Sequence, residues 1–252
     1  MAEPLGYKPR LANSFMAVYS AYLINFTIPR AGEIARASIL TNYEKIPFEK
    51  GFGTIVAERV ADTIMLLLII SIALFLQFDV IYEFFTNKFE LSTITVAIIG
   101  LILIGSLGIY LFKKGTHPFI IKVRSFISGI IEGALSIFKM KQKWAFIGHT
   151  LFIWIMYVAM FYITSLSIEP LGIIPFEALL IAFIMASFSI AATNGGIGSF
   201  PEAVVIALTL FNLPEDPSRA FGWIMWASQT LVIIILGGLS LVYLPIYNRK
   251  KS

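Results

Sequence analysis

The sequence predicts an all-α membrane protein, a polytopic helical bundle that contains two broken helix hairpins of opposite orientation. Three observations predict this class. The 252 residues are 58% hydrophobic and 13% charged, with a mean hydropathy of +0.85, whereas about a quarter of the residues in a soluble domain are charged. Several apolar stretches reach the roughly 20 residues that cross a bilayer. Two other apolar stretches are interrupted near their middle by Pro or Gly and polar residues.

Four stretches are long and apolar enough to be spanning helices: residues 54–78, 91–112, 144–168 and 220–246. Residues 119–139 place apolar side chains at helical spacing beside basic ones, which favours an amphipathic helix on the inner leaflet. A helix packed against the spans is the alternative for this segment. All of these elements are expected to form one integral membrane domain over residues 1–252.

Basic residues predict the orientation of the chain. Seven Lys and Arg lie between positions 113 and 143 against one acid, Glu132, and three more follow position 248. The positive-inside rule places both groups in the cytoplasm, so both termini are expected on the cytoplasmic side. The protein itself is expected in the plasma membrane. Residues 11–40 would then enter from the cytoplasm and return, and residues 175–213 would do the same from outside. A full crossing at either broken stretch is the alternative.

The first interruption reads NFTIPRAGEIAR and begins at Asn25. Pro29 ends one helix, and Arg30, Glu33 and Arg36 follow at a spacing that places them roughly along one helix face. One interpretation is a Glu33–Arg36 ion pair that stabilises the helix start. The other is that Arg30 or Arg36 and the helix N-terminus bind a phosphate, because free backbone donors and guanidinium geometry both suit that anion.

A second charged motif, ERVAD, stands at the start of the apolar stretch 54–78. Glu58 and Asp62 are four residues apart and share a face, and Arg59 can reach Asp62. These charges are either an interfacial cluster with snorkelling side chains or the counterpart of the arginines in the first motif. In the second interpretation they close a polar network or accept a proton during transport, because charges at bilayer depth are costly unless they are paired or functional.

The third motif, ATNGGIGSFPE, interrupts the stretch 175–213. Asn194 and three glycines, Gly195, Gly196 and Gly198, allow close backbone approach and positive φ. Ser199 and Glu202 have the spacing of a capping box. The alternative is a helix N-terminus at membrane depth that faces an anionic headgroup. A nucleotide-binding loop is excluded because no strand precedes the glycines and no Lys follows them.

Metal ions and cofactors are not expected. The chain has no Cys and only two His, His117 and His149, and His149 in an apolar helix favours a structural hydrogen bond. The four tryptophans are expected to be belt or lipid-facing residues without a site role: Trp144, Trp154, Trp223 and Trp226.

The order and spacing of the three motifs resemble those of the lysylphosphatidylglycerol synthase transmembrane family, also called flippase-like membrane proteins. The resemblance implies translocation of a lipid or a lipid-linked molecule. Members of that family usually have further apolar helices before the first motif, so such N-terminal helices are expected to be missing here. Bifunctional members also carry a soluble aminoacyltransferase domain after the membrane part, and this sequence ends at Ser252. The chain is therefore not expected to be the synthase.

The sequence thus favours a carrier, and not an enzyme, that moves an anionic phospholipid or a polyprenyl-linked lipid between leaflets. One alternative is an enzyme acting on a lipid-linked substrate with Glu58 or Asp62 as general base, and another is a non-transporting subunit that serves a synthase or glycosyltransferase. No nucleic-acid partner is expected, and homo-oligomerisation is left open. The predicted substrate-binding residues are Asn25, Arg30, Glu33, Arg36, Glu58, Arg59, Asp62, Asn194, Gly195, Gly196, Gly198 and Glu202.

Overall fold

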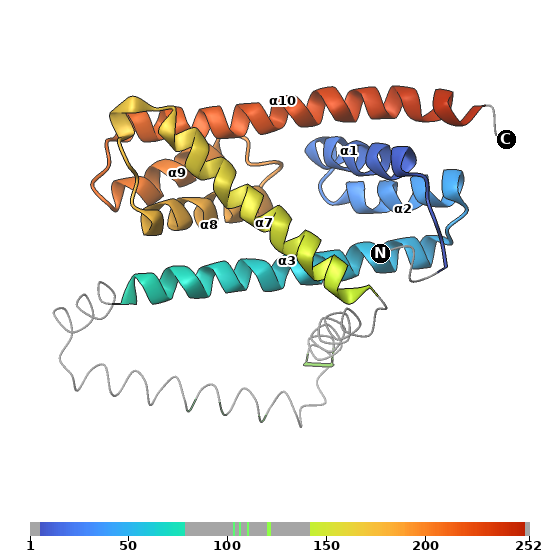
Figure 1. The fold of residues 1–252 in the computed structure, drawn as a ribbon, viewed down its shortest axis with the longest axis horizontal. Coiled ribbons are helices and arrows are strands. Elements are labelled where there is room, and N and C mark those ends of the chain that lie inside the picture. Colours follow the sequence, from blue (N-terminus) through green and yellow to red (C-terminus); the bar gives the residue numbers. More distant parts are fainter. Residues whose placement is uncertain are drawn as a thin grey trace.

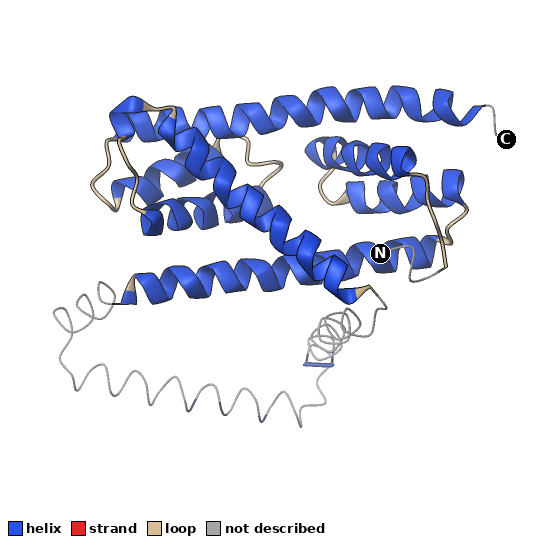
Figure 2. Cartoon of the chain, in the orientation of Figure 1, coloured by secondary structure: helices blue, strands red, loops and turns tan. Residues whose placement is uncertain are grey.

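A computed structural model describes residues 6–78 and 142–249, together with isolated positions 103, 106, 110, 120 and 121. Within these residues every regular element is a helix and there is no strand (Figure 2). The all-α fold class is therefore confirmed. The predicted span 91–112 and the predicted amphipathic helix 119–139 lie outside the described ranges, apart from those isolated positions.

Three described helices are long and apolar enough to cross a membrane: α3 (Phe48–Leu76), α7 (Lys143–Leu166) and α10 (Glu215–Asn248). Large apolar side chains such as Leu67, Ile155 and Val242 are exposed along them, as expected of surfaces that face lipid. Helix α3 begins six residues earlier than the stretch 54–78 suggested. Pro47 precedes its first turn, and the helix continues through Gly51, which packs against Ala37 and Ile46.

Both interrupted stretches form helix hairpins. The first consists of α1 (Leu11–Thr27) and α2 (Ala31–Glu44), and the second of α8 (Phe176–Ala192) and α9 (Ser199–Thr209), preceded by the short 3₁₀ helix η2 (Glu169–Leu171). At 1.5 Å per residue, α1 and α8 are each about 26 Å long, α2 is about 21 Å long and α9 is about 17 Å long. Each is shorter than the roughly 30 Å hydrocarbon core, so none matches it alone.

The two hairpins lie end to end along α10, with α3 on their opposite side and α7 crossing the bundle obliquely (Figure 1). The C-terminal half of α10 packs on α1, where a Cβ on Gly237 would come within 2.6 Å of the Leu23 Cβ. The N-terminal half packs on α9, where a Cβ on Gly222 would lie 2.7 Å from the Cα of Pro201. Small residues thus let the helix backbones approach closely, as in other membrane bundles.

The tips of the hairpins touch each other. Gly195 has φ +64°, and a Cβ there would lie 2.6 Å from a ring carbon of Phe26 at the end of α1. Trp226 in α10 donates its indole N–H to the Gly195 carbonyl at 2.8 Å. Trp226 lies beside the second tip, and Gly237 packs on α1 of the first hairpin. The contact between the two tips therefore lies beside the stretch of α10 between these residues, which is about 16 Å long and forms the middle part of that helix. The two hairpins therefore approach each other from opposite ends of the bundle.

The open end of the first hairpin is fastened to the C-terminus of α10. Arg10, just before α1, donates to the Glu44 carboxylate at 2.8 Å and to the Asn248 side chain at 2.6 Å. Asn13 and Asn248 exchange two hydrogen bonds of 3.0 Å, and Asn13 is fully buried. The start of α1, the end of α2 and the end of α10 consequently lie together.

A cluster of apolar residues between α7, α8, α9 and α10 forms the main core. Phe161 is at its centre and contacts the rings of Phe183, Phe200 and Phe221 at centroid distances of 5.3 to 6.1 Å. These aromatic pairs join the second hairpin to two spanning helices. The first hairpin, by contrast, meets α3 through charged side chains.

Candidate functional site

The turn between α1 and α2 packs the start of α2 directly against α1. Pro29 precedes Arg30, which has φ +62°, and α2 starts at the next residue. The Asn25 side chain accepts a hydrogen bond of 2.7 Å from the Gly32 N–H, which satisfies a donor that the helix start leaves free. Gly32 lies on the Ala21 carbonyl with no room for a side chain. This packing places Glu33 and Arg36 on the side of α2 that faces α3.

The strongest contact between the first hairpin and α3 is an ion pair of Arg36 with Glu58. The two terminal nitrogens of the guanidinium donate to the two carboxylate oxygens at 2.6 and 3.1 Å. The side chains are 20% and 27% exposed. A bidentate, largely buried pair of this kind has strict geometry, so it fixes the position of α2 on α3.

Arg59 lies between two other carboxylates. Its Nε is 3.5 Å from Glu33 on α2, and a terminal nitrogen is 3.4 Å from Asp62 on its own helix. The second oxygen of Asp62 accepts a hydrogen bond of 3.3 Å from the Trp154 indole of α7. The cluster therefore joins the neighbouring helices α2 and α3 to α7, which is far from them in the sequence.

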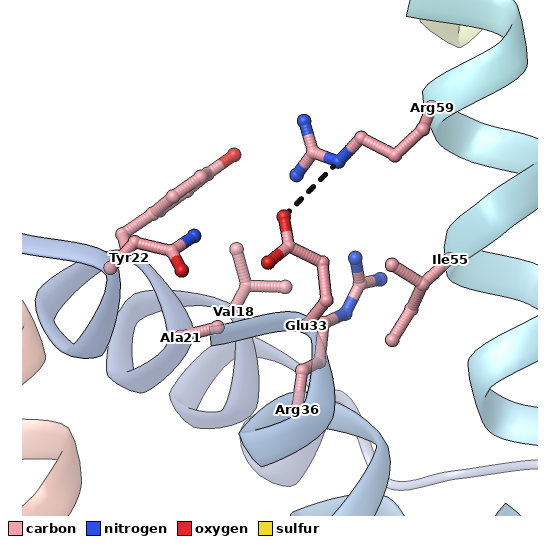
Figure 3. A pocket seen from close by; sticks show the side chains of 8 residues that line it. Val18, Ala21, Tyr22, Glu33, Arg36, Ile55 and Arg59 are labelled. Atoms are coloured by element: carbon pink, nitrogen blue, oxygen red, sulfur yellow. Dashed lines mark ion pairs between the residues drawn. The ribbon is translucent and has the colours of Figure 1, made fainter. Parts of the chain in front are cut away.

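A small cavity opens beside these charges (Figure 3). About 260 Å³ of empty space lies within it, its open mouth included. Arg59 extends across it from α3 towards Glu33 and Tyr22. Two of its polar atoms, Glu33 Oε2 and Arg36 Nε, are fully buried and have no hydrogen-bond partner among the residues that the structure describes. Its lining residues are Val18, Ala21, Tyr22, Asn25, Glu33, Arg36, Ile55 and Arg59.

The structure distinguishes between the two interpretations of each charged motif. The Glu33–Arg36 ion pair within α2 is wrong, because both side chains turn to α3. Because α3 begins at Phe48, Glu58 and Asp62 lie about 15 and 21 Å along it. Glu58 of the second motif pairs with Arg36 of the first, as the network interpretation predicted, whereas Asp62 pairs with Arg59 of its own motif.

Arg30 does not join this network. It is exposed at the tip of the first hairpin, and no ion pair or hydrogen bond of its side chain occurs in the part of the chain that the structure describes. Its backbone is left-handed, which is rare for residues other than Gly. Arg30 therefore presents an uncompensated positive charge beside the junction of the two hairpins.

The tip of the second hairpin carries hydroxyl groups as well as the expected glycines. Ser199 shares hydrogen bonds of 2.7 Å with Ser189 and 3.0 Å with Thr193, and Thr193 accepts one of 3.2 Å from the Gly196 N–H. Gly195, Gly196 and Gly198 all have positive φ, which only glycine adopts without strain. Asn194 lies in the same turn but supplies no side-chain contact that the structure describes.

The capping box of α9 is wrong, and Glu202 lies apart from the other predicted site residues. Gly198 precedes the first helical residue and no side chain caps the helix. Ser199 instead bonds across to α8, and Glu202 pairs with Arg219 of α10, which also binds Glu215 at 2.6 Å. Glu202 therefore belongs to an exposed ion-pair group between α9 and α10.

Sequence reasoning missed two tryptophans that hold the site together. Trp144 and Trp223 are exposed as predicted, but Trp154 is buried with 8% exposure and bonds to Asp62, and Trp226 bonds to Gly195. Both stand near the middle of long apolar helices, far from the interfaces where belt residues occur. An indole N–H at that depth needs a partner, and this was the available signal.

Comparison with known proteins agrees with the architecture. The family described as lysylphosphatidylglycerol synthase TM region matches residues 1–238. UPF0104 membrane protein MJ1595 of Methanocaldococcus jannaschii is 26% identical over 281 aligned positions, which cover 98% of this chain and 79% of that protein. No solved structure matches. The family match covers nearly the whole chain and includes the three motifs, so this chain belongs to the lysylphosphatidylglycerol synthase transmembrane region family.

Proposed function

We propose that the protein is a flippase-like carrier that moves a phospholipid or polyprenyl-linked lipid between leaflets without altering it chemically. The headgroup phosphate binds at the cavity between α1, α2 and α3, while the lipid tails stay in the bilayer. The observation that carries this proposal is the charged cavity next to the meeting point of two opposed broken hairpins.

Two opposed hairpins suit this task because each half of the membrane is filled by a separate unit. Secondary carriers often bind substrates near the bilayer midplane between such broken helices, where freed backbone groups face a polar cavity. Arg30 at the first tip is available to an anion, since its side chain is exposed and has no acidic partner in the described chain.

We further propose that the hairpins are re-entrant from opposite faces, with both termini in the cytoplasm and the protein in the plasma membrane. The basic residues before position 51 and after position 248 support this orientation. The hydrogen bonds between Arg10 and Asn248 support a common side for the two ends of the described chain. A lipid-modifying synthase or glycosyltransferase is the proposed partner class.

Leaflet exchange in proteoliposomes tests the carrier function. Fluorescent phosphatidylglycerol in the inner leaflet should become accessible to an impermeant quencher when the wild-type protein is present. The double variant Arg30→Ala/Arg59→Ala should slow the exchange at least about tenfold, because each lost charge-assisted hydrogen bond to the phosphate is worth roughly 1.5–3 kcal/mol. Arg219→Ala is the matched control, since it removes an arginine whose partners, Glu202 and Glu215, lie outside the cavity.

Two results would contradict the proposal. Wild-type protein that exchanges none of the tested phospholipids would rule out the carrier function. Normal exchange by the double variant would instead show that the assigned residues do not bind substrate. Recovery of a chemically altered lipid, detected by mass spectrometry, would favour an enzyme.

A further inference from the structure

The two arginines of the cavity are held very differently. Arg36 places both terminal nitrogens on one carboxylate, at 2.6 and 3.1 Å from the oxygens of Glu58. Neither nitrogen can turn to a ligand without leaving Glu58 as a largely buried, unpaired charge, which costs several kcal/mol. Arg36 therefore serves to keep α2 on α3.

Arg59 is held less tightly, although it is the ion-pair partner of Glu33 in the described chain, and the Glu33 side chain is 23% exposed. The distances of Arg59 to Glu33 and Asp62 are 3.5 and 3.4 Å, longer than the 2.7–2.9 Å of a strong charge-assisted hydrogen bond. Its side chain is 52% exposed, so reorienting it requires little desolvation. Exposed ion pairs of this kind contribute little to stability.

Position adds to this difference. The Arg59 guanidinium extends into the cavity, facing Tyr22 and Glu33 (Figure 3). Asp62 keeps a second partner, the Trp154 indole, so it does not lose all of its hydrogen bonds if the guanidinium moves. A phosphate group in the cavity can therefore contact the Arg59 guanidinium while Asp62 keeps its bond to Trp154.

We infer that Arg59 is the residue that binds the substrate phosphate, by exchanging its weak contacts with Glu33 and Asp62 for the phosphate oxygens, whereas Arg36 and Glu58 form a purely structural pair. This inference rests on the proposed carrier function and identifies the group that recognises the headgroup. The planar guanidinium can donate two hydrogen bonds to one phosphate, which the ammonium of Lys cannot do in the same geometry.

Binding measurements on the detergent-solubilised full chain test the division of roles. Native mass spectrometry would compare phosphatidylglycerol with diacylglycerol, which lacks the phosphate. Arg59→Gln should weaken phosphatidylglycerol binding at least about tenfold without changing diacylglycerol binding or the melting temperature. Arg59→Lys should recover only part of the affinity.

Arg219→Gln is the matched control, because the partners of this arginine, Glu202 and Glu215, lie outside the cavity. It should keep phosphatidylglycerol affinity within about threefold of wild type, and an equal loss of affinity in Arg219→Gln and Arg59→Gln would overturn the inference. Unchanged affinity of Arg59→Gln would do the same. Arg36→Gln, which leaves Glu58 without its guanidinium partner, should instead lower the melting temperature.

Two further arms separate the lipid from a free anion and this inference from the carrier function. Phosphatidylglycerol should stay bound in excess inorganic phosphate, because its tails add apolar contact; displacement by inorganic phosphate would overturn the assignment to a lipid. Arg59-dependent binding without leaflet exchange would support the role of Arg59 and contradict the carrier function.

Discussion

Gly32 shows how a single residue determines the geometry of the site. Its N–H bonds to the Asn25 side chain, and the position of a Cβ is already occupied by the Ala21 carbonyl and the Asn25 amide. Any side chain would push α2 away from α1. Since α2 carries Glu33 and Arg36, that displacement would also move both charges relative to α3.

Gly32→Ala is therefore expected to destabilise the protein by about 1–3 kcal/mol, the usual cost of overpacking. Gly53→Ala is the matched control, because a Cβ there meets no described atom within 4 Å and Ala favours the helix. Thermal unfolding in detergent, followed by circular dichroism, measures both. A melting temperature of Gly32→Ala equal to that of Gly53→Ala would show that α1 and α2 are not packed this closely.

At the level of single side chains, the arginines near the site differ in how firmly carboxylates bind them. Arg36, Arg59 and Arg30 are all arginines near one hairpin tip, yet they are respectively locked, loosely held and unpaired within the described chain. Spacing along α2 suggested that Arg30, Glu33 and Arg36 act together. The structure separates them because Arg30 precedes the first turn of the helix and has a left-handed backbone.

At the scale of helices and hairpins, Glu44 at the end of α2 binds Arg10, just before α1, and so joins the two free ends of the first hairpin. This carboxylate is 8% exposed and accepts hydrogen bonds from the Arg10 backbone, the Arg10 guanidinium and Asn13. Burial alone would raise the pKa of Glu44, but these donors outweigh it and hold the pKa below its ordinary value of 4.5. The ionised form is therefore the one that the folded protein favours.

A lowered pKa in the folded state makes the contribution of Glu44 dependent on pH. Its stabilisation is complete above the unfolded pKa and is lost as pH falls through the folded pKa. The melting temperature difference between wild type and Glu44→Gln should therefore be constant from about pH 7 to 5 and shrink below about pH 4.5. Circular dichroism between pH 3 and 7 measures it, and a difference that grows on acidification would contradict this role.

The second hairpin also explains why the third motif looked like a capping box. Ser199 and Glu202 have the right spacing, but Gly196 and Gly198 turn the chain so that Ser199 meets Ser189 of α8 and Thr193, which follows that helix. Arg219 of α10 then supplies a better partner for Glu202 than a backbone N–H. Tertiary contacts outweighed the local pattern.

For the whole molecule, the arrangement predicts which positions share a membrane face. Glu49 follows the open end of the first hairpin, which is bonded to the end of α10, whereas Asp216 lies at the opposite end of α10. The natural chain has no Cys, so single cysteines report accessibility without background. Glu49→Cys and Arg249→Cys should react with an impermeant maleimide from the cytoplasmic side, and Asp216→Cys from the outside.

Labelling in intact cells and in inverted vesicles would measure this. Reaction of Glu49→Cys and Asp216→Cys from the same side would contradict the end-to-end hairpins. Reaction from opposite sides in the reverse sense would keep the arrangement but invert the proposed orientation, against the distribution of basic residues.

The sequence by itself determined the membrane class, the two broken hairpins, the ends of α7 and α10 to within five residues and the family. These follow from composition, hydrophobic length and interruptions, which are properties of contiguous segments. Only the tertiary structure decided that Arg36 pairs with Glu58 and that Glu202 pairs with Arg219 instead. It also decided that Trp154 bonds to Asp62 and that Trp226 bonds to Gly195. Those contacts depend on where separate helices cross, and local sequence patterns carry no record of that geometry.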